Sequence, residues 1–257
     1  MLSKIIGQSV WGLWVTLIIS TEIFATEPIT ISSTKDHTTF LEVYTSQGCS
    51  SCPPAERWLS TFTDNKTLWS GLIPLNFHVD YWDYLGWKDP FALAEFSQRQ
   101  RIYAALNKSK YVATPGFMVN GKGWQDWFNQ RALPLNSAKH SGVLIATIKN
   151  KKINVNFNDS TKRDDDLVAH VALLGFSIET EVKSGENKGQ LLKHDFVVIG
   201  YQQSNMEVNK TLALAKLTLP TPYGVATTKQ AIVFWVSQKN DPTPLQVAAN
   251  WLYTRSI

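Results

Sequence analysis

The chain contains two cysteines in 257 residues, and they lie three positions apart in the sequence Cys49-Ser50-Ser51-Cys52. They can form only one intramolecular disulfide, which closes a very small ring. Such a ring restricts little of the unfolded chain, because the stabilisation by a cross-link grows with loop length. The pair is therefore better suited to thiol–disulfide chemistry or to metal binding than to stabilising the fold.

The segments on either side of the pair predict where the two sulfurs lie. Residues 39–45 have the β-branched and aromatic content of a strand, and residues 53–62 have a helical pattern that begins with two prolines. Cys49 then lies at the N-terminus of a helix, where free N–H groups and the helix dipole favour a thiolate. We expect Cys49 to be the attacking sulfur and Cys52 the resolving sulfur of exchange through a mixed disulfide.

Metal binding by the cysteine pair is the less favoured interpretation. A closed zinc site usually has four ligands, and the chain offers only two cysteines. Two histidine or acidic side chains would have to converge on them. His170 and His194 show no partner pattern in the sequence and are expected to be structural or on the surface. We therefore predict redox chemistry with no bound metal and no organic cofactor.

A second candidate element is the dipeptide Thr114-Pro115, which precedes a short predicted strand at residues 117–119. A proline in the cis form would suit a sharp turn beside the sulfurs. The alternative is an ordinary proline at the start of a strand. Because the cysteine pair follows the first predicted strand, we favour a catalytic loop that includes Thr114 and Pro115.

A dense group of polar and aromatic residues spans positions 78–89, with the sequence HVDYWDYLGWKD. It begins at the carboxyl end of a predicted strand, and ligands of open α/β sheets bind outside such ends. We expect His78 and Asp80 to tune the thiols or to bind a metal, and Trp82 to line a substrate groove. The alternative is a structural loop whose aromatic side chains pack on the helices.

The order of predicted elements changes near residue 142. Before it, strands and helices alternate, which is typical of a parallel sheet with crossover helices. After it, short β-rich runs are separated by turns and charged loops, which is typical of a sandwich or barrel. We predict an α/β domain over residues 26–140 and a β-rich, sandwich-like domain over residues 141–257. The β-rich runs are residues 143–148, 153–157, 167–176, 196–201, 212–219 and 231–237.

Residues 1–25 are typical of a secretory signal, with Lys4 near the start, an apolar stretch at residues 10–19 and Ala25 at a cleavage position. The apolar stretch is about 10 residues long, whereas a spanning helix needs about 20. We expect cleavage and a secreted or periplasmic protein with no membrane span, and an uncleaved anchor is the alternative. The formal net charge of +4, with no arginine-rich stripe, does not indicate a nucleic-acid partner.

Three segments resemble a known family: FLEVYTSQGCSSCPPAE, IPLNFHVDYWDYLGWKDPFA and TPGFMVNG. They are similar to the secreted, thioredoxin-like proteins of domain-of-unknown-function family 1223, and more widely to thioredoxin-like oxidoreductases. The resemblance covers residues 39–121, and residues 185–198 also resemble the second half of this family. It implies a thioredoxin-like domain with an additional β-rich domain, and it implies no particular substrate. The Ser-Ser pair between the cysteines differs from the Gly-Pro of thioredoxins and leaves the redox potential open.

The resemblance also makes Glu42 a candidate. Thioredoxins have a buried carboxylate near this place in the first strand, which accepts the proton of the resolving thiol, and a raised pKa suits that role. The alternative is a solvated glutamate on the face of a strand.

The predicted function is thiol–disulfide exchange on protein or small-molecule thiols, with a redox protein as a candidate partner. The first alternative is a metal carrier of the copper type that uses the cysteine pair with His78 or Asp80, because thiolates suit Cu(I). The second is a binding scaffold whose cysteines are inactive.

Overall fold

The protein is represented by a computed structural model that describes residues 27–135, 141–159, 166–224 and 227–252. The predicted signal peptide, residues 1–25, lies outside these ranges. Within them, no helix is both long enough and apolar enough to cross a membrane.

Strands dominate the described residues, which contain fifteen strands, two α-helices and three short 3₁₀ helices. The helices are α1 Pro53–Ser60, α2 Ala94–Ala105, η1 Thr61–Asp64, η2 Asp83–Leu85 and η3 Asp126–Asn129. The strands are β1 Ile29–Ser32, β2 Thr39–Thr45, β3 Leu72–His78, β4 Gly116–Val119, β5 Lys122–Gly123, β6 Val143–Lys149, β7 Lys152–Asn158, β8 Leu167–Gly175, β9 Ile178–Glu181, β10 Leu191–His194, β11 Val197–Asn205, β12 Glu207–Asn209, β13 Leu212–Thr218, β14 Gln230–Gln238 and β15 Asp241–Leu252.

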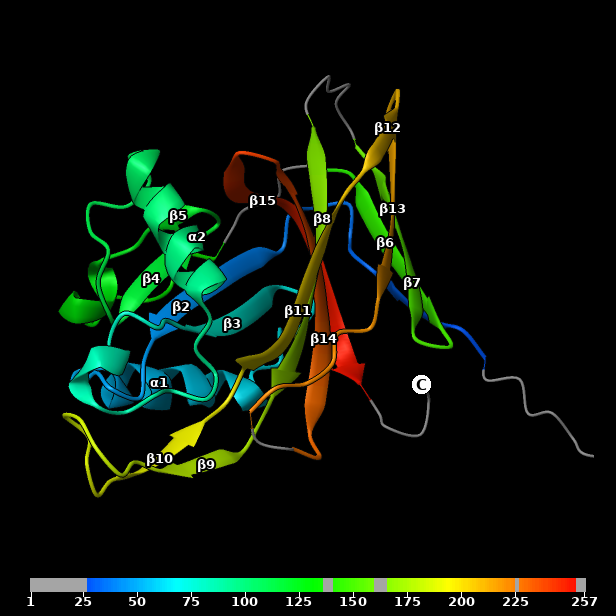
Figure 1. Cartoon of the computed structure of the whole chain (residues 1–257). Coiled ribbons are helices and arrows are strands. Elements are labelled where there is room, and N and C mark those ends of the chain that lie inside the picture. The colour runs from blue at the N-terminus through cyan, green and yellow to red at the C-terminus, as the bar shows by residue number, and fades with distance from the viewer. Residues whose placement is uncertain (1–26, 136–140, 160–165, 225–226, 253–257) are drawn as a thin grey trace, which may run out of the picture.

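These strands form three sheets (Figure 1). The largest has eight strands in the order β15-β14-β8-β11-β3-β2-β4-β5. The second has five strands in the order β1-β6-β7-β13-β12, and β9 pairs with β10 in a separate hairpin. The hairpin lies beside α1, and α1 and α2 lie next to the β2–β5 end of the large sheet (Figure 1).

The predicted fold class, an α/β thioredoxin-like domain followed by a sandwich-like β-rich domain, is wrong. The eight-stranded sheet takes strands from both sides of residue 140, because β11 pairs in parallel with β3 at Val197 and Asn76 and pairs antiparallel with β8. The pattern of apolar residues in the sequence predicts many of these strands, but it does not predict which strands pair with one another. An edge of β3 left open would expose unpaired backbone groups, and β11 satisfies that edge.

Two apolar cores lie on opposite faces of the large sheet. Strand β14 contributes to both, since Val233 and Trp235 belong to one core and Ile232, Phe234 and Val236 to the other. This alternation follows from the two-residue period of a strand. The first core also contains side chains of α1 and α2, and the second is closed by the five-stranded sheet.

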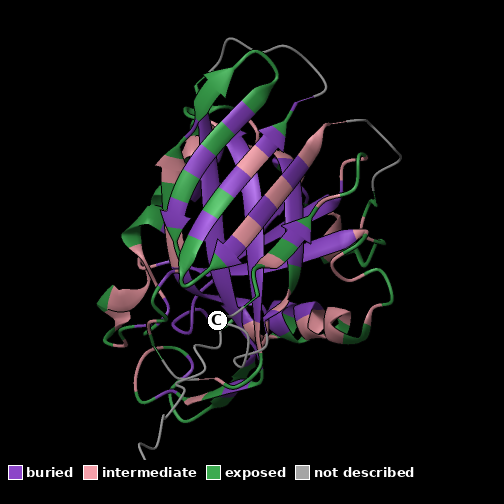
Figure 2. Ribbon diagram, turned by 90° about the vertical axis from the view of Figure 1, so that its right-hand side faces the viewer, coloured by how far each residue is buried: buried purple, intermediate pink, exposed green. Residues whose placement is uncertain are grey.

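The five-stranded sheet buries only one of its faces. Buried and exposed residues alternate along β7 and β13, and the banding of these strands is visible in Figure 2. By contrast, every residue of β8 is buried. The large sheet is therefore the central layer of the molecule, covered on both faces, as a sheet buried on two sides requires.

Parallel pairing brings the candidate site together at one end of β2 and β3. Thr45 at the end of β2 is the register partner of His78 at the end of β3. The cysteine pair follows β2, and residues 79–89 follow β3, so both loops leave the sheet at the same edge.

Candidate functional site

Cys49 and Cys52 form a disulfide with their Cα atoms 5.5 Å apart. Cys52 is the N-cap of α1, which confirms the predicted order of strand, cysteine pair and helix. The expected free N–H groups are missing from residues 53–56, however. Pro53 and Pro54 have no N–H, and the N–H groups of Ala55 and Glu56 donate to the Cys52 carbonyl oxygen. The first turn of α1 therefore offers no free N–H group to a cysteine thiolate. The backbone of this helix can stabilise a thiolate only through the helix dipole.

The sulfur of Cys49 is covered in this form of the protein. Only 1% of Cys49 is exposed, although Ser50 and Ser51 beside it are exposed. Its Sγ lies 3.3 Å from the Ser51 hydroxyl oxygen and 3.6 Å from the Thr114 carbonyl oxygen. The Thr114–Pro115 peptide bond is cis, as predicted, and the loop that contains it lies against the sulfur.

Trp82 contacts both this loop and the cysteine segment. Its indole N–H donates to the Thr114 hydroxyl over 2.7 Å. The main chain of Gly48 approaches the same tryptophan so closely that a Cβ added there would lie 3.1 Å from the Trp82 Cβ.

His78 is fully enclosed beneath the cysteine loop and pairs with Asp89. The His78 Nδ1 and Asp89 Oδ2 atoms are 2.7 Å apart, and both side chains have no exposed surface. Asp89 also accepts the N–H groups of Gln47 at 2.8 Å and Phe91 at 3.0 Å. Burial alone lowers the pKa of His78, but the paired Asp89 and the nearby Glu56 outweigh it and raise this pKa above 6.5.

Glu56 and His194 form a second buried pair. The Glu56 carboxylate contacts His194 Nδ1 through Oε2 and accepts the Thr45 hydroxyl through Oε1 at 2.6 Å. Burial raises the pKa of Glu56, but His194, His78 and the Thr45 hydrogen bond together lower this pKa to about 2. The group is therefore a carboxylate at neutral pH.

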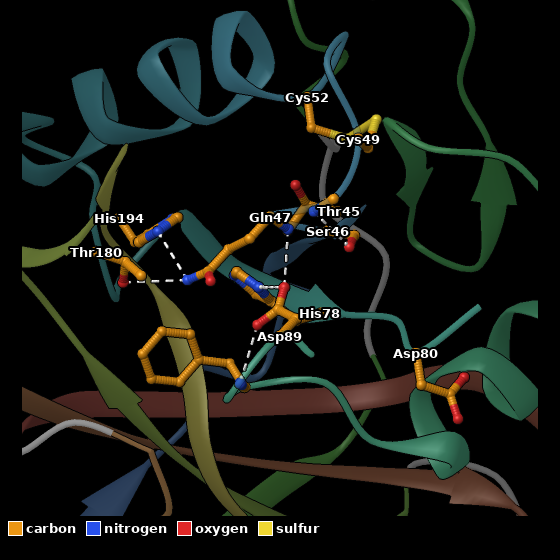
Figure 3. Close-up of polar contacts among 12 residues, drawn as sticks. Thr45, Ser46, Gln47, Cys49, Cys52, His78, Asp80, Asp89, Thr180 and His194 are labelled. Carbon is orange, nitrogen blue, oxygen red and sulfur yellow. Dashed lines mark hydrogen bonds and ion pairs between the residues drawn. A yellow bond between two sulfur atoms is a disulfide. The ribbon is translucent and has the colours of Figure 1, made fainter. Parts of the chain in front are cut away.

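Gln47 connects His194 to the cysteine loop. Its amide nitrogen lies 3.2 Å from His194 Nε2 and donates to the Thr180 hydroxyl (Figure 3). Its Oε1 accepts the Trp87 indole N–H over 2.8 Å. Because an indole nitrogen only donates, the Gln47 oxygen must face Trp87 and its NH₂ group must face His194. His194 therefore accepts at Nε2 and carries its proton on Nδ1, facing Glu56.

We call Gln47, Glu56, His78, Asp89 and His194 the buried polar cluster. Figure 3 shows Gln47, His78, Asp89 and His194 beneath the disulfide, and Glu56 joins them through its contact with His194. Its members come from the cysteine loop, α1, the end of β3, the loop after β3, and β10.

The loop between β9 and β10 holds the backbone of the cysteine segment from the outside. The buried Asn187 amide donates to the carbonyl oxygens of Gln47 and Cys49, both over 2.9 Å. Glu186 accepts the Ser50 N–H over 2.9 Å. The hairpin therefore contacts both the disulfide loop and the buried polar cluster.

Asp80 does not join this cluster. Its carboxylate accepts the Ser97 hydroxyl on α2, and Figure 3 shows its side chain well away from those of His78 and Asp89. His78 and Asp80 were predicted to act together, but their side chains lie in different surroundings.

Glu42 is buried, but its contacts among the described residues lie with α2 rather than with the cysteines. It pairs with Arg99 at 2.8 Å and accepts the hydroxyl groups of Tyr103 and Tyr44. The alternative of a solvated glutamate is wrong, since Glu42 has no exposed surface. This position of Glu42 does not support its predicted role as the acceptor of the proton of the resolving thiol.

Sequence reasoning missed Glu56, Asp89, Gln47 and His194. A signal existed for Glu56, because residues four apart in a helix lie on one face and Glu56 follows Cys52 by four. No local signal marks His194, which is 138 residues beyond Glu56.

The comparisons identify the family. Residues 40–237 match the family described as "Protein of unknown function (DUF1223)". The chain belongs to this family. No curated protein sequence matches the chain.

Two solved structures of the same general fold are similar to this DUF1223 protein. Protein AGR_C_4864 of Agrobacterium tumefaciens is 22% identical with a TM-score of 0.56, and the match covers 86% of this chain and 96% of that one. HBP35 of Porphyromonas gingivalis is 11% identical with a TM-score of 0.51, and the match covers 86% of this chain and 76% of that one. At these identities the similarity shows the fold alone.

Proposed function

We propose that the protein is a thiol–disulfide oxidoreductase whose redox centre is the Cys49–Cys52 pair. The observation that carries the proposal is the disulfide itself, which joins the only two cysteines at the start of α1. A cross-link between residues three apart adds little stability, so chemistry is the better reason for it. The resemblance to thioredoxin-like oxidoreductases in the CxxC motif and the cis-proline loop supports the same function.

Exchange would follow the usual two displacements. In the dithiol form, the Cys49 thiolate attacks a substrate disulfide, a mixed disulfide forms, and one substrate sulfur leaves as a thiolate. Cys52 then attacks the Cys49 sulfur, which releases the second substrate sulfur and restores the Cys49–Cys52 disulfide. The substrate gains the two electrons that the cysteine pair loses, and the reverse sequence oxidises a substrate dithiol.

Two neighbours suit Cys49 for this role. The Ser51 hydroxyl, 3.3 Å from Sγ, can donate a hydrogen bond to a thiolate, and the Thr114 carbonyl oxygen at 3.6 Å can accept one from a thiol. Charge-assisted hydrogen bonds of the first kind favour the ionised form and lower the pKa of a thiol.

The substrate would approach over Trp82 rather than over His78. Trp82 is partly exposed and is hydrogen-bonded to Thr114, whose carbonyl oxygen lies 3.6 Å from the Cys49 sulfur, whereas His78 is buried beneath the loop. Tyr84, 77% exposed, stacks with Trp82 at a ring-centroid distance of 6.4 Å. We propose that these rings form the substrate contact, with protein or small-molecule thiols as substrates and a redox protein as partner. The chemistry suits an oxidising compartment, in keeping with the predicted export.

The predicted copper-type carrier has less support. Its proposed oxygen ligand Asp80 is bound to Ser97, and the one group of potential metal ligands found among the described residues contains neither cysteine. No specific observation favours the scaffold alternative.

The deciding experiment is mixed-disulfide trapping. Cys52→Ser removes the resolving thiol, so adducts between Cys49 and its substrates should accumulate and disappear on reduction. The matched control Cys49→Ser should give none, because the attacking sulfur is absent. Equal amounts of adducts in both variants, or none in either under conditions that reduce the wild-type disulfide, would reject the proposal.

A further inference from the structure

Three side chains of the buried polar cluster could hold a metal ion. Glu56, His78 and His194 each offer one ligand atom, and these atoms all lie within 4.8 Å of one another. All three residues are buried. We propose that they form a binding site for a divalent transition-metal cation of the zinc type, separate from the cysteine sulfurs.

The His78 ring supplies an independent observation. Its buried Nε2 has no hydrogen-bond partner anywhere in the part of the chain that the structure describes, while its Nδ1 is held by Asp89 at 2.7 Å. A buried polar atom with no partner costs free energy and is uncommon in folded proteins. A histidine that donates one ring N–H to a carboxylate presents its other nitrogen as an oriented ligand, and such carboxylate–histidine–metal arrangements are common in zinc sites.

The donor set fits this class of cation. Two imidazoles and one carboxylate are borderline ligands that suit Zn²⁺, and three protein ligands leave a fourth position open. Metal–ligand bonds of about 2.0–2.2 Å place tetrahedral ligand atoms roughly 3.4 Å apart. Since the three atoms already lie within 4.8 Å, small side-chain rotations are enough to close the site.

Binding would also rearrange Gln47. In the described state the proton of His194 is on Nδ1, between that atom and Glu56. A metal bound at Nδ1 displaces it, so that the neutral ring must carry its single proton on Nε2 instead, with no net loss of a proton from His194. The Gln47 amide must then turn to accept from Nε2, and Trp87 loses its acceptor. The fluorescence of Trp87 should therefore report occupancy.

A surface pocket reaches one of the three proposed ligands, Glu56. A pocket of about 270 Å³ between α1 and β10 has Glu56 in its lining, together with Pro53, Arg57 and Leu192. A cation can therefore reach Glu56 without passing the disulfide. The site does not use Cys49 or Cys52, so binding should occur in the disulfide form of the protein.

The test uses the full chain in its disulfide form after removal of metal by a chelator. Titration with Zn²⁺, followed by calorimetry and tryptophan fluorescence, should show one saturable equivalent. Co²⁺ should give the visible absorption of a tetrahedral site without a thiolate charge-transfer band. Glu56→Gln, His78→Gln and His194→Gln should each weaken binding at least tenfold, and Asp89→Asn should weaken it by about 10–100-fold through His78.

Two controls distinguish this site from binding by a histidine elsewhere and from binding by the cysteines. His170→Gln changes a buried histidine outside the cluster and should leave the affinity unchanged. The double variant Cys49→Ser/Cys52→Ser should also retain binding, whereas it abolishes disulfide exchange, so the metal site and the redox function can fail separately. Absence of saturable binding in the folded wild type overturns the proposal even if the ligand variants fold poorly. Loss of binding in the double cysteine variant alone, or its persistence in all three ligand variants, overturns it as well.

Discussion

Glu56 follows Cys52 by one helical turn, and its N–H donates to the Cys52 carbonyl oxygen over 3.1 Å. The carboxylate of the same residue pairs with His194 at the end of β10, 138 residues further along the chain. The helix that carries the resolving cysteine is therefore joined to the β9–β10 hairpin by a buried hydrogen bond from His194 Nδ1 to the Glu56 carboxylate. The charge of Glu56 should contribute to the stability of this part of the fold.

This contribution should depend on pH in the acid range. Because the pKa of Glu56 is about 2 in the fold and its ordinary value is 4.5, the stabilisation is complete above pH 4.5 and is lost as the pH falls towards 2. Between these values we expect the free energy of unfolding of the wild type to fall by roughly 3 kcal/mol more than that of Glu56→Gln. Denaturant unfolding of both metal-free proteins measures this difference, and parallel pH profiles would show that the Glu56 carboxylate does not stabilise the fold.

The pair of His78 and Asp89 should give the stability of the fold the opposite dependence on pH. The pKa of His78 is raised above 6.5, so its stabilisation is complete below pH 6.5 and is lost as the pH rises through the raised value. In Asp89→Asn we expect the pKa of His78 to fall and the loss of stability towards alkaline pH to become smaller. NMR titration of the metal-free protein follows the His78 ring directly, and an unchanged pKa in the variant would show that Asp89 is not the cause.

Local sequence signals explain what could be predicted of the site. The strand before Cys49, the prolines after Cys52 and the dipeptide Thr114-Pro115 each have a short-range pattern, and the structure confirms the placement of each. His194 lies on a separate hairpin, so only tertiary structure brings it to Glu56. The sequence around His194 shows no partner pattern and therefore predicts only a structural or surface residue.

The predicted fold class is wrong for a related reason. Alternating apolar residues reveal a strand and its buried face, but they do not identify the neighbour with which it forms hydrogen bonds. The sequence pattern assigns the residues of β11 to a separate sandwich-like domain. In the structure β11 pairs with β3 on one edge and with β8 on the other. A single parallel contact, Val197 with Asn76, joins strands that the sequence pattern had assigned to different domains.

Loosening the Thr114 loop that lies against Cys49 should accelerate the reactions of this cysteine. Trp82→Phe keeps an aromatic ring but removes the hydrogen bond to the Thr114 hydroxyl. We expect the Cys49–Cys52 disulfide to be reduced several-fold faster by a small dithiol, with little change in stability. Trp69→Phe is the matched control, because the buried Trp69 indole nitrogen has no hydrogen-bond partner among the described residues. Equal reduction rates in the wild type and Trp82→Phe would show that this contact does not limit access.

Glu42 should matter for stability rather than for exchange. Glu42→Gln leaves the Arg99 guanidinium buried beside a neutral partner, and breaking such a pair costs about 3–5 kcal/mol. We expect a lower melting temperature and an unchanged rate of disulfide exchange measured below the transition. The exposed Glu207→Gln on β12 controls for the loss of a carboxylate. A slower exchange at unchanged stability would restore the role of proton acceptor.

Residues 26–140 should not fold when expressed alone. In the full chain β3 is flanked by β2 and β11, and without the later strands β3 becomes an open edge. The first core would also lose Trp235, whose ring packs against Phe40 at a centroid distance of 5.4 Å and against Phe77 at 6.5 Å. Removing so large a buried side chain typically costs about 3–5 kcal/mol, and here several are lost together.

The fragment can be compared with residues 26–257 prepared in the same way. We expect the fragment to be insoluble, or soluble with unprotected amide hydrogens and few dispersed NMR signals, while the longer chain shows a cooperative unfolding transition. Supplying residues 141–257 as a second fragment should restore part of the native signal, because the missing sheet neighbours return. A dispersed spectrum and intact disulfide exchange from residues 26–140 alone would show that the first half folds without β11, β8 and β14, and that the shared sheet joins two units that are stable separately.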